Sequence, residues 1–218
     1  MLVLAIDTAT AATSVAVIDL DDPDSPLAVR QHVDARAHGE RLAPMISEVL
    51  AEAGARVGKL TALVAGTGPG PFTGLRVGLA TAAAIGQAAG IACYGVCSLD
   101  GIGALTSGRA LVATDARRRE IYWASYRDGV RVVGPAVDRP ADLPAHHAHR
   151  AYGEGALRYQ EELGLPVADA PLYPVPSALA RLAADRVRSG APGEPLTPRY
   201  LRRPDAAVPG APKPVTAR

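Results

Sequence analysis

The sequence predicts an α/β fold made of two related halves, and two observations lead to this prediction. The first is the order of elements, because three short apolar runs with polar turns between them are followed by alternating helical and strand patterns. The second is an internal likeness: ALVATDARRREIYWASY (110–126) repeats the form of the opening LVLAIDTATAATSVAVI. Each segment has an apolar strand, an Asp near its end, a polar turn and a second apolar strand. We therefore expect a duplicated α/β domain.

The first half carries the clearest periodicities. The expected elements are strands at 2–7, 13–19, 27–35 and 62–66, helices at 38–54 and 73–89, and a strand around Tyr94. The first three strands predict an antiparallel meander. Gly54 is a typical C-terminal stop for the first helix, and the later strand, helix and strand predict a parallel crossover unit.

The second half is less regular. The pattern predicts strand, turn and strand over 110–126, a short helix over 156–163, and an amphipathic helix from Ser177, its expected N-cap, to about Ser189. We expect an N-terminal lobe at 1–106, a smaller C-terminal lobe at 107–203 and a Pro-rich tail at 204–218. Since the tail has hardly any large apolar residue, it is expected to be disordered.

Composition limits the classes of function. The 218 residues carry a formal net charge of only +1, so any contact with a polyanion must come from local arginine clusters. The sequence has neither a membrane-spanning apolar stretch nor the pattern of a secretory signal, so we expect a cytoplasmic protein without a membrane partner. Cys93 and Cys97 are expected to be reduced, and HHAH at 146–149 is interpreted as a loop and not as a metal site.

The loop GTGPGPFTGLRVG at 66–78 raises the question of phosphate binding. It lacks the Gly-Lys-Ser/Thr end of a P-loop and the third glycine of a dinucleotide motif. Pro69 and Pro71 also remove two of the N–H donors that a phosphate cradle would use. The sequence therefore disfavours a phosphate site.

Small residues recur every fourth position in the helix that follows this loop. They are Gly74, Gly78, Ala82, Gly86 and Gly90. Such a row lets another element approach closely, and each glycine inside a helix costs roughly 1 kcal/mol relative to alanine. Two interpretations stay open: the row packs against the protein's own helix or sheet, or part of it forms a docking surface for another subunit.

Several motifs together resemble one known family. They are AIDTAT at the N-terminus, HGERLAPMI (38–46), GTGPGPFTGLRVGLATAAAIG (66–86), GVCSLDGIGAL (95–105), ATDARRREIYWASY (113–126) and PRYLRR (198–203). The chain resembles the TsaB (YeaZ) family, the dimerisation subunits of the bacterial tRNA threonylcarbamoyladenosine machinery. The resemblance implies a duplicated ribonuclease-H-like fold of the actin, sugar-kinase and Hsp70 ATPase superfamily.

The resemblance also implies a non-catalytic scaffold that pairs with the TsaD transferase and the TsaE ATPase, so that TsaD modifies adenosine 37 of tRNA. By the same resemblance, the isolated chain forms a homodimer through the surface that otherwise receives TsaD. The residues expected in this interface are Leu42, Met45, Val49, Gly74, Val77, Gly78, Thr81, Ala82, Ile85 and Gly86.

An enzymatic role is disfavoured, because the helix at 73–89 lacks the histidine pair of the catalytic paralogue. No catalytic residue, metal ligand or cofactor is expected for the isolated chain, and ATP with Mg²⁺ is expected only in the complex. Asp7, Thr8 and Thr10 mark a vestigial nucleotide cleft, unless they serve turn chemistry, which we favour. The alternatives are a free-standing ATPase or small-molecule kinase that uses Asp7, and a homodimeric regulator without a transferase partner.

Three consecutive arginines form the clearest basic cluster. Arg117, Arg118 and Arg119 lie in a turn between two strands and are candidates for tRNA contact. The competing interpretation, which we favour, is a solvated turn with local carboxylate partners.

Overall fold

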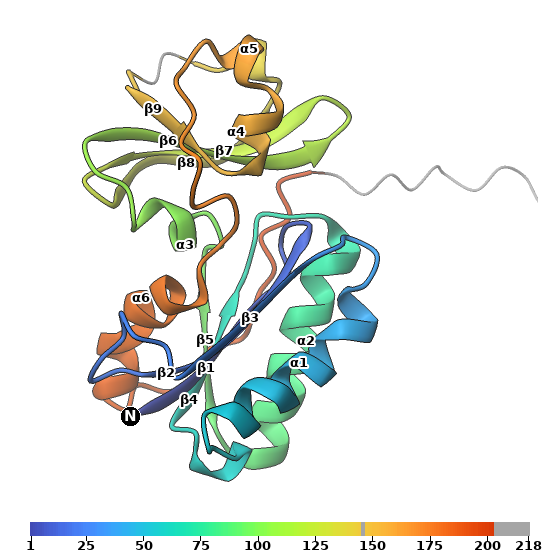
Figure 1. Ribbon diagram of the computed structural model, residues 1–218, viewed down its shortest axis with the longest axis vertical. Helices are drawn as coiled ribbons and strands as arrows, with labels where there is room; N and C mark the ends of the chain where they lie inside the picture. Colours follow the sequence, from blue (N-terminus) through green and yellow to red (C-terminus); the bar gives the residue numbers. More distant parts are fainter. Residues whose placement is uncertain (145–146, 203–218) are drawn as a thin grey trace, which may run out of the picture.

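Two β-sheets, one in each lobe of the molecule, organise the chain (Figure 1). The computed structural model describes residues 1–144 and 147–202, so the predicted disorder of the tail at 204–218 concerns residues outside the described ranges. In the view of Figure 1 the first lobe lies below and the second lies above, with α3 (Asp100–Gly103) between them.

The first lobe has a five-stranded sheet in the order β3-β2-β1-β4-β5. Its elements are β1 (Leu2–Asp7), β2 (Ala12–Asp19), β3 (Ala28–Val33), α1 (His38–Glu52), a 3₁₀ turn (Val57–Lys59), β4 (Ala62–Gly66), α2 (Phe72–Ala89) and β5 (Ala92–Val96). The first three strands pair antiparallel, and β4 and β5 run parallel to β1. The predicted meander and crossover unit are confirmed.

Both faces of this sheet are covered. In β1, Leu4 and Ile6 face α1 and α2, whereas Val3 and Ala5 face the opposite layer. Because helices cover both sides, the central strands are continuous apolar runs without alternation of polar residues. Figure 1 shows α1 and α2 together on one side of the sheet and α6 (Pro176–Arg188) on the other.

The second lobe repeats this connectivity with the strand order β8-β7-β6-β9. Its elements are β6 (Arg109–Arg117), β7 (Glu120–Arg127), β8 (Val130–Asp138), a 3₁₀ turn (Pro140–Asp142), β9 (Arg150–Tyr152), α4 (Glu154–Arg158) and α5 (Gln160–Leu163). An antiparallel meander again precedes a parallel strand, and a bridge between Ala151 and Val167 occupies the place of β5. The duplication predicted from the sequence is confirmed, although β8 and β9 were not predicted.

Residues 176–200 pack on the first lobe, which corrects the predicted boundary of a C-terminal lobe at 107–203. Helix α6 buries Leu179, Ala183 and Val187 against β1, β2, β4 and β5. The order of elements in the sequence suggested one continuous C-terminal lobe. The apolar side of α6 packs instead on the face of the first-lobe sheet that α1 and α2 leave uncovered. Ser177 is also not the N-cap, because the helix begins at Pro176, whose fixed φ suits the first turn.

Cys93 and Cys97 are free thiols, as predicted, and burial raises the pKa of both. Among the helices of the described ranges, none is long and apolar enough to cross a bilayer.

The packing of α6 predicts a contrast between two leucines of one helix. Leu179 is fully buried and Leu182 is 43% exposed. Leu179→Ala should lower the free energy of unfolding by about 2–5 kcal/mol, because it leaves a cavity against the first-lobe sheet. Leu182→Ala, the matched control, should change it by less than about 0.5 kcal/mol. Urea denaturation followed by circular dichroism measures both, and equal effects would contradict this placement of α6.

Candidate functional site

The glycine-rich loop packs against the end of β1. A Cβ atom at Gly66 would lie 1.7 Å from Oδ2 of Asp7, and one at Gly70 would lie 2.1 Å from the carbonyl oxygen of Ala9. Only glycine permits these approaches. The loop is therefore shaped by the fold of its own lobe, in agreement with the sequence argument against a phosphate cradle.

Asp7 is held inside this junction. Its Oδ2 accepts a hydrogen bond from Oγ of Ser98 at 2.5 Å, and its Oδ1 accepts the backbone N–H of Ala9 at 2.9 Å. Burial raises the pKa of Asp7 to about 6, although both hydrogen bonds oppose the rise. Both carboxylate oxygens are thus engaged within the protein.

Thr8 fastens β1 to α2. Its hydroxyl donates to the carbonyl of Gly74 at 2.7 Å and accepts the N–H of Gly78 at 3.0 Å. Thr10 accepts the N–H of Ala12, so Asp7 and Thr10 perform the turn chemistry that we favoured. Of the three residues assigned to a vestigial nucleotide cleft, only Thr10 lines the cleft between the lobes, and the assignment of Asp7 and Thr8 is corrected.

That cleft has a volume of about 330 Å³ and is lined by residues from both lobes. His38 comes from the first lobe, where its Nδ1 lies 2.7 Å from Oγ1 of Thr13, and burial lowers its pKa. Glu154 comes from the second lobe and accepts the N–H of Asp115 at 3.0 Å. Burial raises the pKa of Glu154 to about 8.

The glycines beside Glu154 are explained by packing. A Cβ atom at Gly153 would lie 2.3 Å from the carbonyl oxygen of Ala113, and one at Gly155 would lie 2.6 Å from the carbonyl carbon of Thr114. These glycines let β9 and α4 approach β6, much as Gly66 lets β4 approach Asp7. In both lobes, glycines thus allow a neighbouring segment to pack closely against the end of the first strand.

Arg117, Arg118 and Arg119 form the exposed turn between β6 and β7, and each has a positive φ, of 61°, 51° and 63°. Left-handed backbone costs roughly 1–2 kcal/mol for a residue with a side chain. Asp115 accepts the N–H of Arg117 at the start of this turn, and Arg117 also lines the cleft. Contact of these arginines with tRNA stays a prediction.

The predicted partner interface needs the largest correction. Seven of its ten residues are buried in the chain's own core: Leu42, Met45, Val49, Gly74, Gly78, Ala82 and Gly86. The other three, Val77, Thr81 and Ile85, are half-buried.

The small-residue row on α2 faces the sheet of its own lobe. A Cβ atom would lie 2.5 Å from Oγ1 of Thr8 at position 78, and 2.3 Å from Sγ of Cys93 at position 86. The first of the two open interpretations is therefore correct for Gly74, Gly78, Ala82 and Gly86. A docking surface on α2 would therefore use the side of the helix that faces away from the sheet.

That opposite side exposes uncharged and mostly small side chains. On α2 they are Ala80, Ala83, Ala84 and Gln87, and on α1 they are Ala43, Pro44, Ser47 and Ala51. We call these eight residues the outer helix face. On α2 these positions do not stand out in the sequence, because a run of alanines has no distinctive period and only its buried members follow a regular row.

An aromatic and arginine cluster adjoins the outer helix face at the start of α2. The rings of Phe72 and Tyr200 have centroids 4.9 Å apart, and the guanidinium of Arg76 lies 3.8 Å from the centroid of Phe72. Nε of Arg76 donates to the hydroxyl of Tyr200 at 2.9 Å. Although Phe72 and Tyr200 have large aromatic side chains, they are 41% and 38% exposed, respectively.

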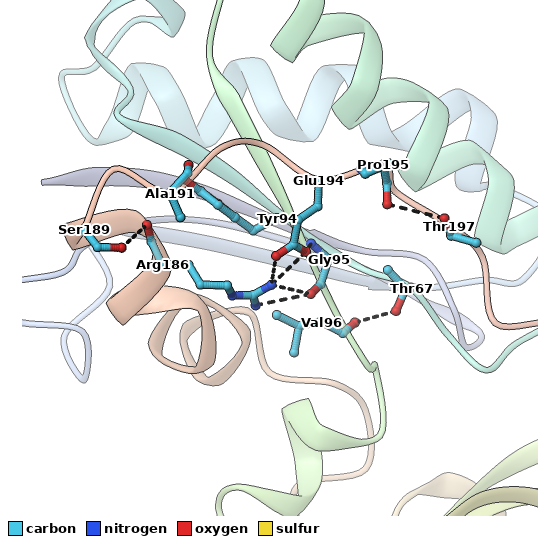
Figure 2. A network of polar contacts seen from close by, with 10 residues as sticks. All are labelled: Thr67, Tyr94, Gly95, Val96, Arg186, Ser189, Ala191, Glu194, Pro195 and Thr197. Carbon is cyan, nitrogen blue, oxygen red and sulfur yellow. Dashed lines mark hydrogen bonds and ion pairs between the residues drawn. The ribbon is translucent and has the colours of Figure 1, made fainter.

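Tyr200 ends a C-terminal strap, residues 191–200, which runs along the edge strand β5 (Figure 2). The N–H of Glu194 donates to the carbonyl of Cys93, and the hydroxyl of Tyr94 donates to the carbonyl of Ala191. The guanidinium of Arg186 bonds both the carboxylate of Glu194 and the carbonyl of Gly95. The strap covers an otherwise open sheet edge and carries Tyr200 to α2.

Two lobes of the same connectivity, joined beside a cleft, define the duplicated ribonuclease-H-like fold of the actin, sugar-kinase and Hsp70 ATPase superfamily. A family model, TsaD: tRNA N6-adenosine threonylcarbamoyltransferase, matches residues 31–160, which is more than half of the chain. Within this superfamily the chain belongs to the TsaB (YeaZ) family.

Three similar proteins illustrate the relationship. A Mycobacterium leprae protein is 50% identical over 217 residues, which cover 99% of this chain and 57% of that protein. The tRNA threonylcarbamoyladenosine biosynthesis protein TsaB of Escherichia coli is 37% identical over 132 residues, 58% of this chain and 55% of that protein. The chain thus spans little more than half the length of these two relatives. The solved structure of YeaZ from Pseudomonas aeruginosa has a TM-score of 0.76 at 28% identity and covers 92% of this chain and 99% of its own.

The inward direction of the glycine row leads to a prediction about folding. Gly78→Leu should lower the free energy of unfolding by about 3 kcal/mol or more, because the new side chain collides with Thr8 and breaks its hydrogen bonds to α2. Ala80→Leu, two residues away on the exposed side, should change it by less than about 0.5 kcal/mol. Thermal and urea denaturation compare them. A well-folded Gly78→Leu variant would show that α2 does not pack as described.

The buried Asp7 predicts a pH dependence of stability. Its folded pKa of about 6 lies above the ordinary value of 3.8, so the folded state binds the proton more tightly. The favourable contribution is fully present below the ordinary pKa and is lost as the pH rises through 6. Between about pH 4.5 and 7.5, the wild type should therefore lose roughly 2 kcal/mol more stability than Asp7→Asn does.

Urea titrations at the two pH values measure this difference. Asp22→Asn, at an exposed position of the β2–β3 turn, is the control and should follow the wild type. Identical pH profiles for wild type and Asp7→Asn would contradict the raised pKa.

Proposed function

We propose that the chain is a non-catalytic subunit of tRNA threonylcarbamoyladenosine biosynthesis, which binds a TsaD-type transferase through its outer helix face. Membership of the TsaB family supports a role in this pathway, because the Escherichia coli relative is named as a tRNA threonylcarbamoyladenosine biosynthesis protein. The TsaD model matches residues 31–160, a range that contains α1 and α2. A TsaD-type partner therefore has counterparts of both helices, and the two chains can pair them about a pseudo-twofold axis.

The observation that carries this proposal is the outer helix face itself. Exposed alanines and a serine let a second pair of helices approach closely, and their methyl groups gain from burial. Of the acidic residues of α1, Glu48 and Glu52 lie toward β3, where both pair with Arg30. Glu40, one turn before Pro44, is the acidic residue that remains at the edge of this face.

The cluster of Phe72, Arg76 and Tyr200 supports docking at one end of the same surface. Aromatic residues and arginine are enriched among the side chains that dominate binding energies at interfaces. Here they are held rigid by stacking and by the hydrogen bond to Tyr200, so little side-chain entropy is lost on association.

Further partners follow from the family. In the absence of the transferase, the outer helix face pairs two copies of this chain as a homodimer. The TsaE ATPase joins the assembled pair, and the chain meets tRNA only through that assembly, with Arg117, Arg118 and Arg119 as the candidate contacts. ATP and Mg²⁺ act in the complex, which we place in the cytoplasm.

The engagement of Asp7 supports the non-catalytic part of this proposal. A free-standing ATPase or kinase would need this carboxylate to face a metal-bound nucleotide. Both of its oxygens instead bond Ser98 and Ala9, and it does not line the cleft.

A single substitution tests the docking surface. Ala84→Arg places a long charged side chain in the middle of the outer helix face and should weaken binding to a TsaD-type transferase by more than about 100-fold, since a desolvated charge at an interface core lacks a partner. Leu182→Arg, on the exposed side of α6, is the control and should bind normally. Size-exclusion chromatography and calorimetry with the purified transferase measure both variants.

Circular dichroism should show an unchanged fold for both proteins. A native complex with Ala84→Arg would overturn the proposed surface, and failure of the wild-type chain to bind the transferase would overturn the proposed function.

A further inference from the structure

A second cavity lies in the second lobe, away from the outer helix face and from the cleft between the lobes. Its volume is about 380 Å³, and it is lined by residues of β6, β7 and β8 and by Pro144 and His147 of the loop that follows. Trp123, Val132 and Val133 give it apolar walls, and Ser125, Arg109 and Arg127 give it polar groups. This combination of apolar walls and a few converging polar groups is typical of small-molecule sites.

The two arginines stand directly opposite each other. Arg109 of β6 and Arg127 of β7 are a cross-strand pair, and both side chains are exposed. Like charges in such a pair destabilise a sheet unless something neutralises them. Within residues 1–144 and 147–202, no carboxylate lies within ion-pair distance of either guanidinium. Asp128, the nearest acidic residue along the chain, accepts the N–H of Gly108 and does not line the cavity.

Ser125 supplies an independent observation. It is only 4% exposed, it lines the cavity, and among the described residues its hydroxyl has no hydrogen-bond partner. A buried hydroxyl without a partner costs free energy, so such a group calls for an explanation. The register of β7 with β8 shifts on both sides of Ser125.

We propose that this cavity binds an oxyanion, a phosphate or carboxylate group, on a small organic molecule. The guanidinium groups of Arg109 and Arg127 neutralise the anion, and Ser125 donates its unused hydroxyl to an anion oxygen. The apolar walls at Trp123 and Val133 receive the apolar part of the ligand. The same phosphate chemistry occurs in a free phosphate ester and in an RNA backbone, and the experiment separates these sources.

The test uses the full-length chain with phenyl phosphate, inorganic phosphate and a short single-stranded RNA as probes, followed by calorimetry and by the NMR signal of the Trp123 indole N–H. Phenyl phosphate should bind saturably below about 10 mM. Arg109→Gln and Arg127→Gln should each weaken it about 10-fold or more. Arg150→Gln, at an exposed arginine of the neighbouring β9, is the control and should not change it.

Ser125→Ala separates a ligand contact from a purely structural role. Without a probe, the variant should be at least as stable as the wild type, because it removes an unsatisfied hydroxyl. With saturating phenyl phosphate, the wild type should gain more thermal stability than the variant.

The source of the anion follows from the probes. Binding of phenyl phosphate with loss in both arginine variants supports the small-molecule site. RNA binding alone, with the same losses, would overturn the small-molecule proposal and assign the cavity to an RNA phosphate. If none of the probes binds, or if all variants bind equally, the inference is overturned. The proposed docking to TsaD is unaffected by any of these results, because no residue of the cavity belongs to the outer helix face.

Discussion

The close approach of α2 to the end of β1 is the contact on which the first lobe depends. The hydroxyl of Thr8 bonds the backbone of α2 at Gly74 and at Gly78, and that geometry is open only because neither position has a side chain. Each glycine weakens an isolated helix by roughly 1 kcal/mol. The buried hydrogen bonds and the dense packing against β1 and β5 offset this cost in the folded protein. The helix is therefore stable in the lobe although its glycines would destabilise it in isolation.

This contact also determines which side of α2 is exposed to solvent and available to a partner protein. The glycine row of α2 faces the sheet, so the opposite side of the helix carries the exposed alanines. The neighbouring helix α1 exposes a similar set of small residues. The C-terminal strap then brings Tyr200 against Phe72 and Arg76 at one end of that surface. A core constraint in β1 and a segment almost 200 residues later thus shape one candidate docking surface, which joins local packing to the proposed function.

The two lobes have one connectivity but different surroundings. In each lobe the first strand ends near an aspartate, and a glycine at the end of the parallel strand comes close to the first strand. That glycine is Gly66, the last residue of β4, in one lobe and Gly153, directly after β9, in the other. In the first lobe the aspartate is sealed from solvent and its pKa is raised. In the second lobe Asp115 is partly exposed and pairs with Arg158, while the buried carboxyl group with a raised pKa is that of Glu154. The duplicated fold has therefore kept its backbone device while the polar groups around it have diverged.

The sequence alone determined the local elements of the first lobe, because apolar runs of strand length and a helical apolar period report directly on residues that are close in the chain. Strands 2–7 and 62–66 were placed to the residue, and the duplication was visible in the repeated strand, aspartate and turn. The edge strand β8 escaped notice, since Gly134 and Pro135 interrupt its pattern. Only the tertiary structure decided that α6 and the strap belong to the first lobe and that the glycine row faces inward. A row of small residues removes steric bulk but does not reveal which neighbour fills the space. At Gly78 that neighbour is Thr8, 70 residues away in the sequence, and at Gly86 it is Cys93 on the next strand.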